Sequence, residues 1–260
     1  MKGAPLKVER QGAVLRLTMN RPDAANALDL EGAQALVEAA ILADEDDTIR
    51  CVVLTGEGRF FCAGGDIGGM VAATEGAAAY LKRLAGAFHL AVVRLARMNK
   101  PLVVLVNGPA AGAGVSMAAL GDMVLAGQSA HFTMAYAGIG LSPDGGASWL
   151  LPRLIGLRRA QDMALTNRRV SAEEAAQIGL VTRTVADEDL AAEGQGLVDR
   201  LASGPAMALG CTRRLLLEGM DRSFEAQLEA ELQAIADCAR SDHGQEGIAA
   251  FMEKRKPDYR

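Results

Sequence analysis

The first half of the chain alternates between short apolar runs and longer stretches with helical periodicity. Residues 8–9 and 13–18 predict a hairpin around Gln11-Gly12, because apolar and polar positions alternate there. Later runs lack this alternation, as do strands that are buried on both faces of a sheet. These runs are residues 51–54, 102–106, 123–126 and 132–134.

Helical periodicity predicts helices between these runs and through the last part of the chain. Strand, glycine turn and helix therefore recur along the sequence, and this order predicts an α/β fold. We expect a core over residues 1–200 and a C-terminal helical region over residues 201–260. The expected helices are residues 28–42, 75–98, 113–120, 206–217, 224–239 and 245–253.

Composition narrows the class of protein. Half of the 260 residues are hydrophobic, so a packed globular core is expected. The formal net charge of −5 gives no support for nucleic-acid binding, which usually shows a basic surface. The four cysteines show no CxxC spacing and no neighbouring histidine, so no metal site is predicted and a reducing compartment is expected. No run reaches the ~18 apolar residues of a membrane span or resembles a signal peptide, so we expect a cytoplasmic protein with no membrane partner.

Two turns rich in Gly and Ala are the candidates for chemistry, at residues 61–66 and 107–114. Residues without side chains let a ligand approach the backbone closely. The N–H groups near Ala113 and Gly114 begin a helix, where unpaired donors favour an anion. The same glycines are equally consistent with close packing of a helix on a strand, so both interpretations stay open at this point. Asp66 is expected to close its own turn.

Together with the sequence around them, these turns resemble the enoyl-CoA hydratase/isomerase (crotonase) family. The resemblance extends from about residue 5 to the C-terminus and keeps the order and spacing of every block. The matching blocks are Asn26-Ala27-Leu28, Phe61 to Asp66, Lys100-Pro101, Asn107 to Gly114, Gly121-Asp122, Phe132, Gly140 to Gly146, Leu150 to Arg153 and Ala175 to Val181.

The resemblance implies a crotonase-like spiral of ββα units with a C-terminal helical trimerisation region, and a homotrimer or a dimer of trimers. It also implies that the backbone N–H groups of Gly65 and Ala113 form an oxyanion hole for an acyl-coenzyme A thioester. Coenzyme A is then part of the substrate, and no tightly bound cofactor is expected. The residues that would contact coenzyme A are Ala24, Ala25, Asn26, Leu28, Cys62, Ala63, Gly64, Asp66 and Ile67, with Phe251 and Lys254 reaching the coenzyme A of a neighbouring subunit.

The proton shuttle decides which reaction the enolate undergoes. Two glutamates act in the hydratases of the family, and the matching positions here are Ser116 and Tyr136, which disfavours water addition. Asp144 supplies a carboxylate instead. Its place before Gly145-Gly146 and an apolar run suits a helix N-cap, whereas the resemblance to isomerases of the family, above all those of phenylacetate breakdown, implies a proton shuttle. An enoyl-CoA isomerase is the favoured function.

Three other functions compete with the isomerase. A hydratase would need a carboxylate recruited from elsewhere, such as Glu75. A 4-chlorobenzoyl-CoA dehalogenase would use Asp144 as nucleophile with His89, but Tyr136 stands where those enzymes carry Trp. A non-catalytic acyl-CoA-binding scaffold would have no need of Asp144 and both glycine turns. Tyr136 either hydrogen-bonds a substrate or is a satisfied core phenol, and Ser116 is expected to pack.

Overall fold

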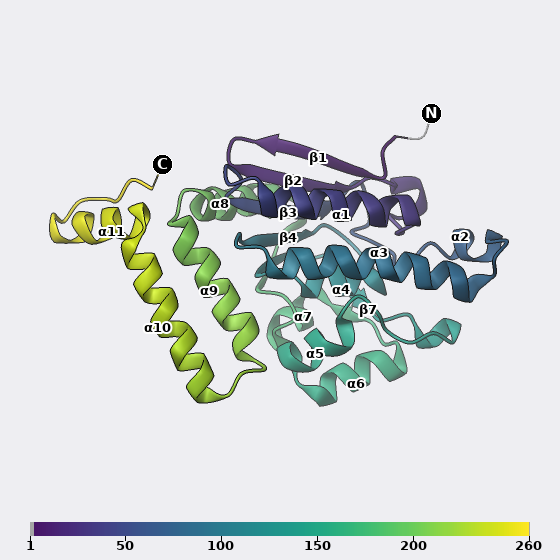
Figure 1. Ribbon diagram of the computed structural model, residues 1–260. Coiled ribbons are helices and arrows are strands. Elements are labelled where there is room, and N and C mark those ends of the chain that lie inside the picture. Colours follow the sequence, from purple (N-terminus) through teal and green to yellow (C-terminus); the bar gives the residue numbers. More distant parts are fainter. Residues whose placement is uncertain (1–2, 260) are drawn as a thin grey trace.

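The computed structural model describes residues 3–259 and shows two sheets wrapped by helices (Figure 1). The main sheet has six strands in the order β1-β2-β3-β4-β6-β9. β1 and β2 pair antiparallel, and the other neighbours in this sheet are parallel. Parallel neighbours need long crossover connections, which helices provide here. The strands are β1 (Leu6–Gln11), β2 (Val14–Met19), β3 (Cys51–Gly56), β4 (Leu102–Val106), β6 (Met123–Gly127) and β9 (Arg183–Val185).

Several helices begin where the sequence offers a capping side chain. Asp29, Asp66, Ser171 and Ser223 each accept a hydrogen bond from the backbone N–H three residues further on. Asp66 therefore closes its turn as expected. The helices are α1 (Leu30–Glu45), α2 (Ile67–Ala72), α3 (Ala77–Arg97), α4 (Ala113–Ala119), α5 (Ala147–Ile155), α6 (Leu157–Thr166), α7 (Ala172–Ile178), α8 (Leu190–Ala202), α9 (Ala206–Gly219), α10 (Phe224–Arg240) and α11 (Asp242–Met252).

Residues of the main sheet alternate between its two faces, and both faces are buried. In β3, Val52 and Leu54 belong to the larger core, which α1 and α3 cover. Cys51 and Val53 belong to a smaller core beneath α8. Helices on both faces explain why the central strands are continuously apolar.

A second sheet of three short strands adjoins the glycine turns. Its order is β5-β7-β8, with β5 and β7 parallel and β7 and β8 antiparallel. Isolated parallel bridges join Leu28 to Gly65 and Cys62 to Ala110, so the first glycine turn lies between residue 28 and β5. The strands are β5 (Ala110–Ala111), β7 (His131–Thr133) and β8 (Val170–Ser171).

The last three helices form a lobe at one side of the molecule (Figure 1). In this lobe α9 stays attached to the body, because its buried Arg213 bonds Asp122 and carbonyl oxygens at the end of α3, while α10 and α11 extend outward. α10 buries none of its residues, and large apolar side chains stay exposed along the lobe. Phe251 is 82% exposed and Phe224 is 73% exposed. Exposure of this extent is typical of a surface that contacts a partner.

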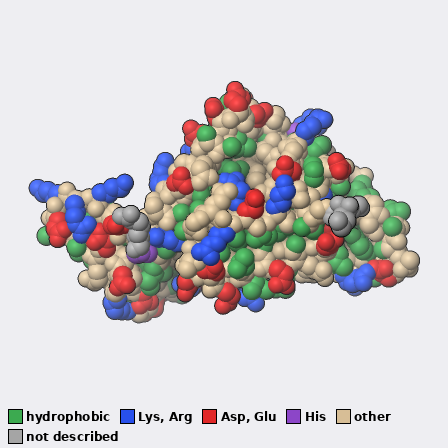
Figure 2. Space-filling view, turned by 90° about the horizontal axis from the view of Figure 1, so that it is seen from above, with side chains coloured by type: hydrophobic (Ala, Val, Ile, Leu, Met, Phe, Trp, Pro, Cys, Tyr) green, Lys and Arg blue, Asp and Glu red, His purple; other side chains and the backbone are tan. Residues whose placement is uncertain are grey.

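On the face shown in Figure 2, acidic and basic side chains are interspersed. Within residues 3–259, no helix combines the length and the apolar character that crossing a membrane requires.

Local pattern predicts most elements of the main sheet and of the tail correctly. β4 begins and ends at the predicted residues, and the hairpin and the three C-terminal helices are confirmed. The first helix begins at Leu30 rather than at residue 28, because Asp29 caps it and Leu28 pairs with Gly65. The elements that pattern did not predict are α2, α5 to α8, β5, β8 and β9.

Candidate active site

The two glycine turns contact each other backbone to backbone. Gly64 has φ +98° and Gly112 has φ +51°, conformations that glycine adopts without strain. A Cβ atom placed on Gly64 would lie 3.1 Å from the carbonyl oxygen of Ala111 and 3.6 Å from the nitrogen of Ala113. The absence of side chains therefore lets the two turns approach, and this approach brings Gly65 and Ala113 together.

Three N–H groups at this contact have no acceptor among residues 3–259, those of Gly65, Ala113 and Gly114. The neighbouring groups are engaged, since the Asp66 N–H donates to Leu28 at 2.9 Å and the Gly112 N–H donates to Thr133 at 3.1 Å. Unpaired backbone donors beside a cavity are suited to bind an oxygen that carries developing negative charge.

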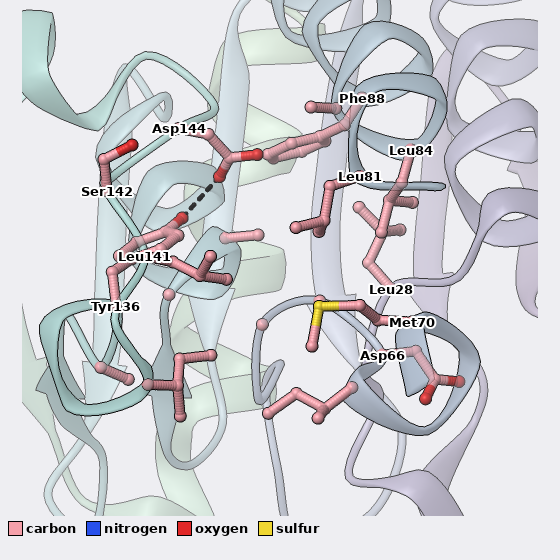
Figure 3. A pocket seen from close by; sticks show the side chains of 18 of the residues that line it. Leu28, Asp66, Met70, Leu81, Leu84, Phe88, Tyr136, Leu141, Ser142 and Asp144 are labelled. Atoms are coloured by element: carbon pink, nitrogen blue, oxygen red, sulfur yellow. Dashed lines mark hydrogen bonds between the residues drawn. The ribbon is translucent and has the colours of Figure 1, made fainter. Parts of the chain in front are cut away.

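A cavity of about 380 Å³ opens beside these donors (Figure 3). Its walls come from the first turn with α2 and α3, and from the second turn with residues 134–144. Most of the side chains are apolar, so a ligand in the cavity would be shielded from water. The large apolar side chains are Leu28, Ile67, Met70, Leu81, Leu84, Phe88, Met134, Ile139 and Leu141.

Asp144 faces this cavity and is held by Tyr136. The Tyr136 hydroxyl donates to Oδ1 of Asp144 at 2.6 Å, the bond drawn in Figure 3. Burial and the adjacent carboxylate of Asp144 raise the pKa of Tyr136, so the phenol stays protonated and remains a donor. Nε2 of His89 lies 3.8 Å from the other oxygen, Oδ2. Oδ1 of Asp144 is thus fixed by a hydrogen bond, whereas no hydrogen bond within residues 3–259 engages Oδ2.

The helix-cap interpretation of Asp144 is wrong. The N-cap of α5 is Gly146, and no side chain caps that helix. Gly145 and Gly146 both have positive φ, at +60° and +82°, and these two residues turn the chain between Asp144 and the helix. The Asp144 side chain therefore points to Tyr136 and not along the axis of α5.

Backbone contacts fix the turn that carries Asp144. The Ser116 hydroxyl donates to the Asp144 carbonyl oxygen at 2.9 Å, so Ser116, which was expected only to pack, also holds this turn. The Gly145 N–H donates to Nε2 of His89 at 3.0 Å. His89 received little weight from the sequence, because Phe-His in this helix is common across the family. Nothing in the spacing of His89 and Gly145 indicates their contact.

The cavity brings together some of the predicted coenzyme A contacts and not others. Leu28, Ala63, Gly64, Asp66 and Ile67 line it, whereas Ala24, Ala25, Asn26 and Cys62 do not.

Two of the residues outside the cavity are engaged within the fold. Asn26 is fully buried. Its amide oxygen accepts a hydrogen bond from the backbone N–H of Arg21, and its amide nitrogen donates to the carbonyl oxygens of Glu57 and Phe60. Burial raises the pKa of the Cys62 thiol to about 12, which makes it a poor nucleophile. These two side chains are therefore buried parts of the fold and do not face the cavity.

Lys254 follows α11, in the lobe that lies at the opposite end of the molecule from α2 (Figure 1). Its side chain is exposed and cannot reach the cavity of its own chain. A contact with coenzyme A would need a neighbouring subunit, as the sequence comparison implied.

The fold and the cavity define an α/β protein in which unpaired backbone N–H groups lie beside a partly buried carboxylate that accepts a hydrogen bond from a tyrosine. The family model for enoyl-CoA hydratase/isomerase matches residues 9–260, and the chain belongs to this family of acyl-CoA enzymes.

Within residues 3–259, no group of three or more His, Cys, Asp or Glu side chains could hold a metal ion.

Relatives with different reactions cover almost the whole chain. The 1,2-epoxyphenylacetyl-CoA isomerase of Escherichia coli (strain K12) is 40% identical over 247 residues, which are 95% of this chain and 94% of that protein. The 4-chlorobenzoyl coenzyme A dehalogenase-2 of Arthrobacter sp is 31% identical over 250 residues, 96% of this chain and 91% of that protein. The crystal structure of an enoyl-CoA hydratase from Polaromonas sp. JS666 superposes with a TM-score of 0.93 at 34% identity, covering 98% of this chain and 99% of that one. The crotonase-like α/β fold expected from the sequence is confirmed.

Replacing Tyr136 with Phe is expected to lower kcat on a 3-enoyl thioester by roughly 10- to 100-fold. The change keeps the ring in the cavity wall but removes the hydrogen bond to Oδ1, and a hydrogen bond to a charged group is worth about 1.5–3 kcal/mol. Steady-state kinetics on a 3-enoyl thioester would measure the effect. Tyr259→Phe, in the C-terminal lobe, is the matched control, and equal rates for both variants would leave Tyr136 as a packing residue only.

Proposed function

We propose that this protein binds an acyl-coenzyme A thioester in the 380 Å³ cavity and isomerises a double bond of the acyl group. The observation that carries the proposal is the placement of the Asp144 carboxylate in the same cavity as the unengaged N–H groups of Gly65 and Ala113. Asp66 also borders the cavity, but its carboxylate is engaged by Arg21 at 2.8 Å and by the Gly69 N–H at 3.1 Å. Asp144 is therefore the carboxylate that is available for proton transfer.

The proposed reaction is a proton shift through a dienolate. Asp144 removes a proton from the carbon α or γ to the thioester, and the electron pair of that C–H bond moves into the π system and onto the thioester oxygen. The N–H groups of Gly65 and Ala113 stabilise this oxygen as its charge grows. The protonated Asp144 then returns the proton at the other carbon, so the double bond moves and no atom is gained or lost.

The structure offers little support for water addition at the position of the hydratase glutamates. Ser116 is fully buried and its hydroxyl is engaged with the Asp144 carbonyl oxygen, and Tyr136 is engaged with the Asp144 carboxylate. Among residues 3–259, the other carboxylate that borders the cavity is that of Asp66, which Arg21 and the Gly69 N–H engage. The likeness to a solved hydratase keeps this reaction as the first alternative.

A second alternative is hydrolytic dehalogenation, with Asp144 as nucleophile. It is supported by the 3.8 Å separation between Nε2 of His89 and Oδ2 of Asp144, and by the likeness to a dehalogenase. Against it, Nε2 already accepts a hydrogen bond from Gly145, so it would have to release this bond before taking a proton from water.

Assays of the wild-type protein with three different thioesters distinguish these functions. We expect trans-3-hexenoyl-CoA to become conjugated, which absorbance would follow, while crotonyl-CoA is hydrated slowly or not at all and 4-chlorobenzoyl-CoA releases no chloride. Hydration of crotonyl-CoA without isomerisation, or chloride release, would replace the isomerase proposal by the corresponding alternative. The likeness to an isomerase of 1,2-epoxyphenylacetyl-CoA favours a ring-containing acyl group as the natural substrate.

We also propose that the protein is a homotrimer or a dimer of trimers. The support is the lobe of α9 to α11, whose apolar side chains lie exposed in a single chain. Lys254 and Phe251 would then face the coenzyme A bound to a neighbouring subunit.

A further inference from the structure

Arg21 lies behind the first glycine turn, outside the cavity, and its guanidinium is bonded on several sides. It donates to the carbonyl oxygen of Ala27 at 2.6 Å and to the carboxylate of Asp66 at 2.8 Å. Oδ2 of Asp29 lies 3.3 Å from Nη1, the guanidinium nitrogen that also donates to Ala27. The Arg21 side chain is 21% exposed, so two carboxylates and the surrounding chain hold the cation in one place.

Two peptide groups connect this cation to the oxyanion donor. The carbonyl of Ala27 belongs to the same peptide as the N–H of Leu28, and that N–H donates to the carbonyl oxygen of Gly64 at 2.7 Å. The carbonyl of Gly64 in turn belongs to the same peptide as the N–H of Gly65. In a trans peptide the C=O and N–H groups point in opposite directions, so each bond aims the next.

From this geometry we infer that Arg21 positions and polarises the Gly65 N–H through the relay Arg21, Ala27-Leu28, Gly64-Gly65. The inference rests on the proposed function, because it concerns one of the two donors of the oxyanion hole. A guanidinium at the start of a hydrogen-bonded chain pulls electron density towards itself along the chain, and each bond strengthens the next. The Gly65 N–H becomes a stronger donor, and its direction is set before the substrate binds.

Asp66 fixes both ends of this arrangement. Its carboxylate holds Arg21, while its own N–H donates to the carbonyl oxygen of Leu28 at 2.9 Å. Although partial burial acts to raise the pKa of Asp66, the hydrogen bonds from Arg21 and Gly69 keep it below its ordinary value. The ion pair therefore stays charged at neutral pH, and Arg21 is a positioning residue that acts through Gly65 without contact to the substrate.

The test is a measurement of how strongly the site polarises a bound thioester. Raman difference spectra of bound 2,4-hexadienoyl-CoA report the stretching frequency of the thioester carbonyl, which falls when hydrogen-bond donors act on its oxygen. For Arg21→Gln we expect a smaller fall in this frequency than for wild type, a kcat lower by about tenfold on trans-3-hexenoyl-CoA, and a nearly unchanged KM. The loss is smaller than the ~10²–10³ expected for deleting a donor, because the N–H itself remains.

Arg10→Gln is the matched control, because Arg10 pairs with Asp46 at 2.9 Å on the surface and has no link to either turn. A wild-type frequency in Arg21→Gln would overturn the inference and leave the oxyanion hole intact. An unshifted carbonyl in the wild type itself would instead reject the oxyanion hole, and with it the proposed function. If Arg21→Gln does not fold, Arg21→Lys is measured instead. Lysine keeps the positive charge but cannot bond Ala27 and Asp66 together, so we expect a carbonyl frequency between that of the free thioester and that of the thioester bound to wild type. The full wild-type shift in Arg21→Lys would reject the relay.

Discussion

Replacing Asp144 with Asn is expected to lower isomerisation of trans-3-hexenoyl-CoA by about 10²–10⁴-fold, while coenzyme A thioesters still bind. A positioned general base contributes a factor of this size, and an amide cannot take up the proton. The amide oxygen can still accept the hydrogen bond from Tyr136, so the shape of the cavity is kept. The rate would be measured by absorbance, and binding by displacement of a fluorescent acyl-CoA.

Asp221→Asn serves as the control, because Asp221 pairs with Arg153 at the surface, at 3.1 Å, and does not border the cavity. Full isomerase activity in Asp144→Asn would show that another group moves the proton, and the assignment of Asp144 would be withdrawn. Loss of binding together with rate would show a structural role instead.

The second large effect is expected for Gly64→Ala. A methyl group there would lie 3.1 Å from the carbonyl oxygen of Ala111, and the left-handed backbone at φ +98° costs a non-glycine residue about 1–3 kcal/mol. The two turns would separate, and the N–H groups of Gly65 and Ala113 would no longer converge on one oxygen. We expect kcat to fall by ~10²–10³, as for loss of an oxyanion-hole donor, with a folded protein of somewhat lower melting temperature.

Gly12→Ala separates the effect of backbone strain from the effect on the site. Gly12 also has positive φ, at +60°, but it lies in the β1–β2 turn and nothing would contact an added Cβ. This variant should lose comparable stability and keep its activity. If Gly64→Ala keeps its activity as well, the approach of the two turns does not build the oxyanion site.

The main sheet could be predicted from the sequence because its signal is local. Five apolar residues between Pro101 and Asn107 specify β4 by themselves, and the two glycine turns mark the points where strands end. β5 and β8 have two residues each, and β9 has three, so no periodicity can show them. Such short strands form only because a neighbouring strand supplies their hydrogen bonds.

Through the family resemblance the sequence named Gly65, Ala113, Asp144 and Tyr136 as candidate site residues, but not the contacts that join the side chains. The resemblance implied the Gly65 and Ala113 donors, whereas the partners of Asp144 are defined by the fold. Tyr136 and His89 lie eight and 55 residues away in sequence, and only the turn at Gly145-Gly146 directs the carboxylate to the first of them. A capping pattern describes the same residues equally well, so the sequence alone could not exclude it.

The residues that line the cavity are far apart in the sequence, and this affects when the cavity can form during folding. The cavity uses residues 28, 63–88, 112–113 and 134–144, and the parallel order β3-β4-β6-β9 closes only when residues 183–185 pair with β6. Parallel pairing across such sequence separations is slow, because chain entropy is lost before the contacts compensate for it. The cavity can therefore be complete only after more than half of the chain has been synthesised. A chain that ends before residue 134 lacks one wall of the cavity, so it cannot form the site that we propose for a thioester.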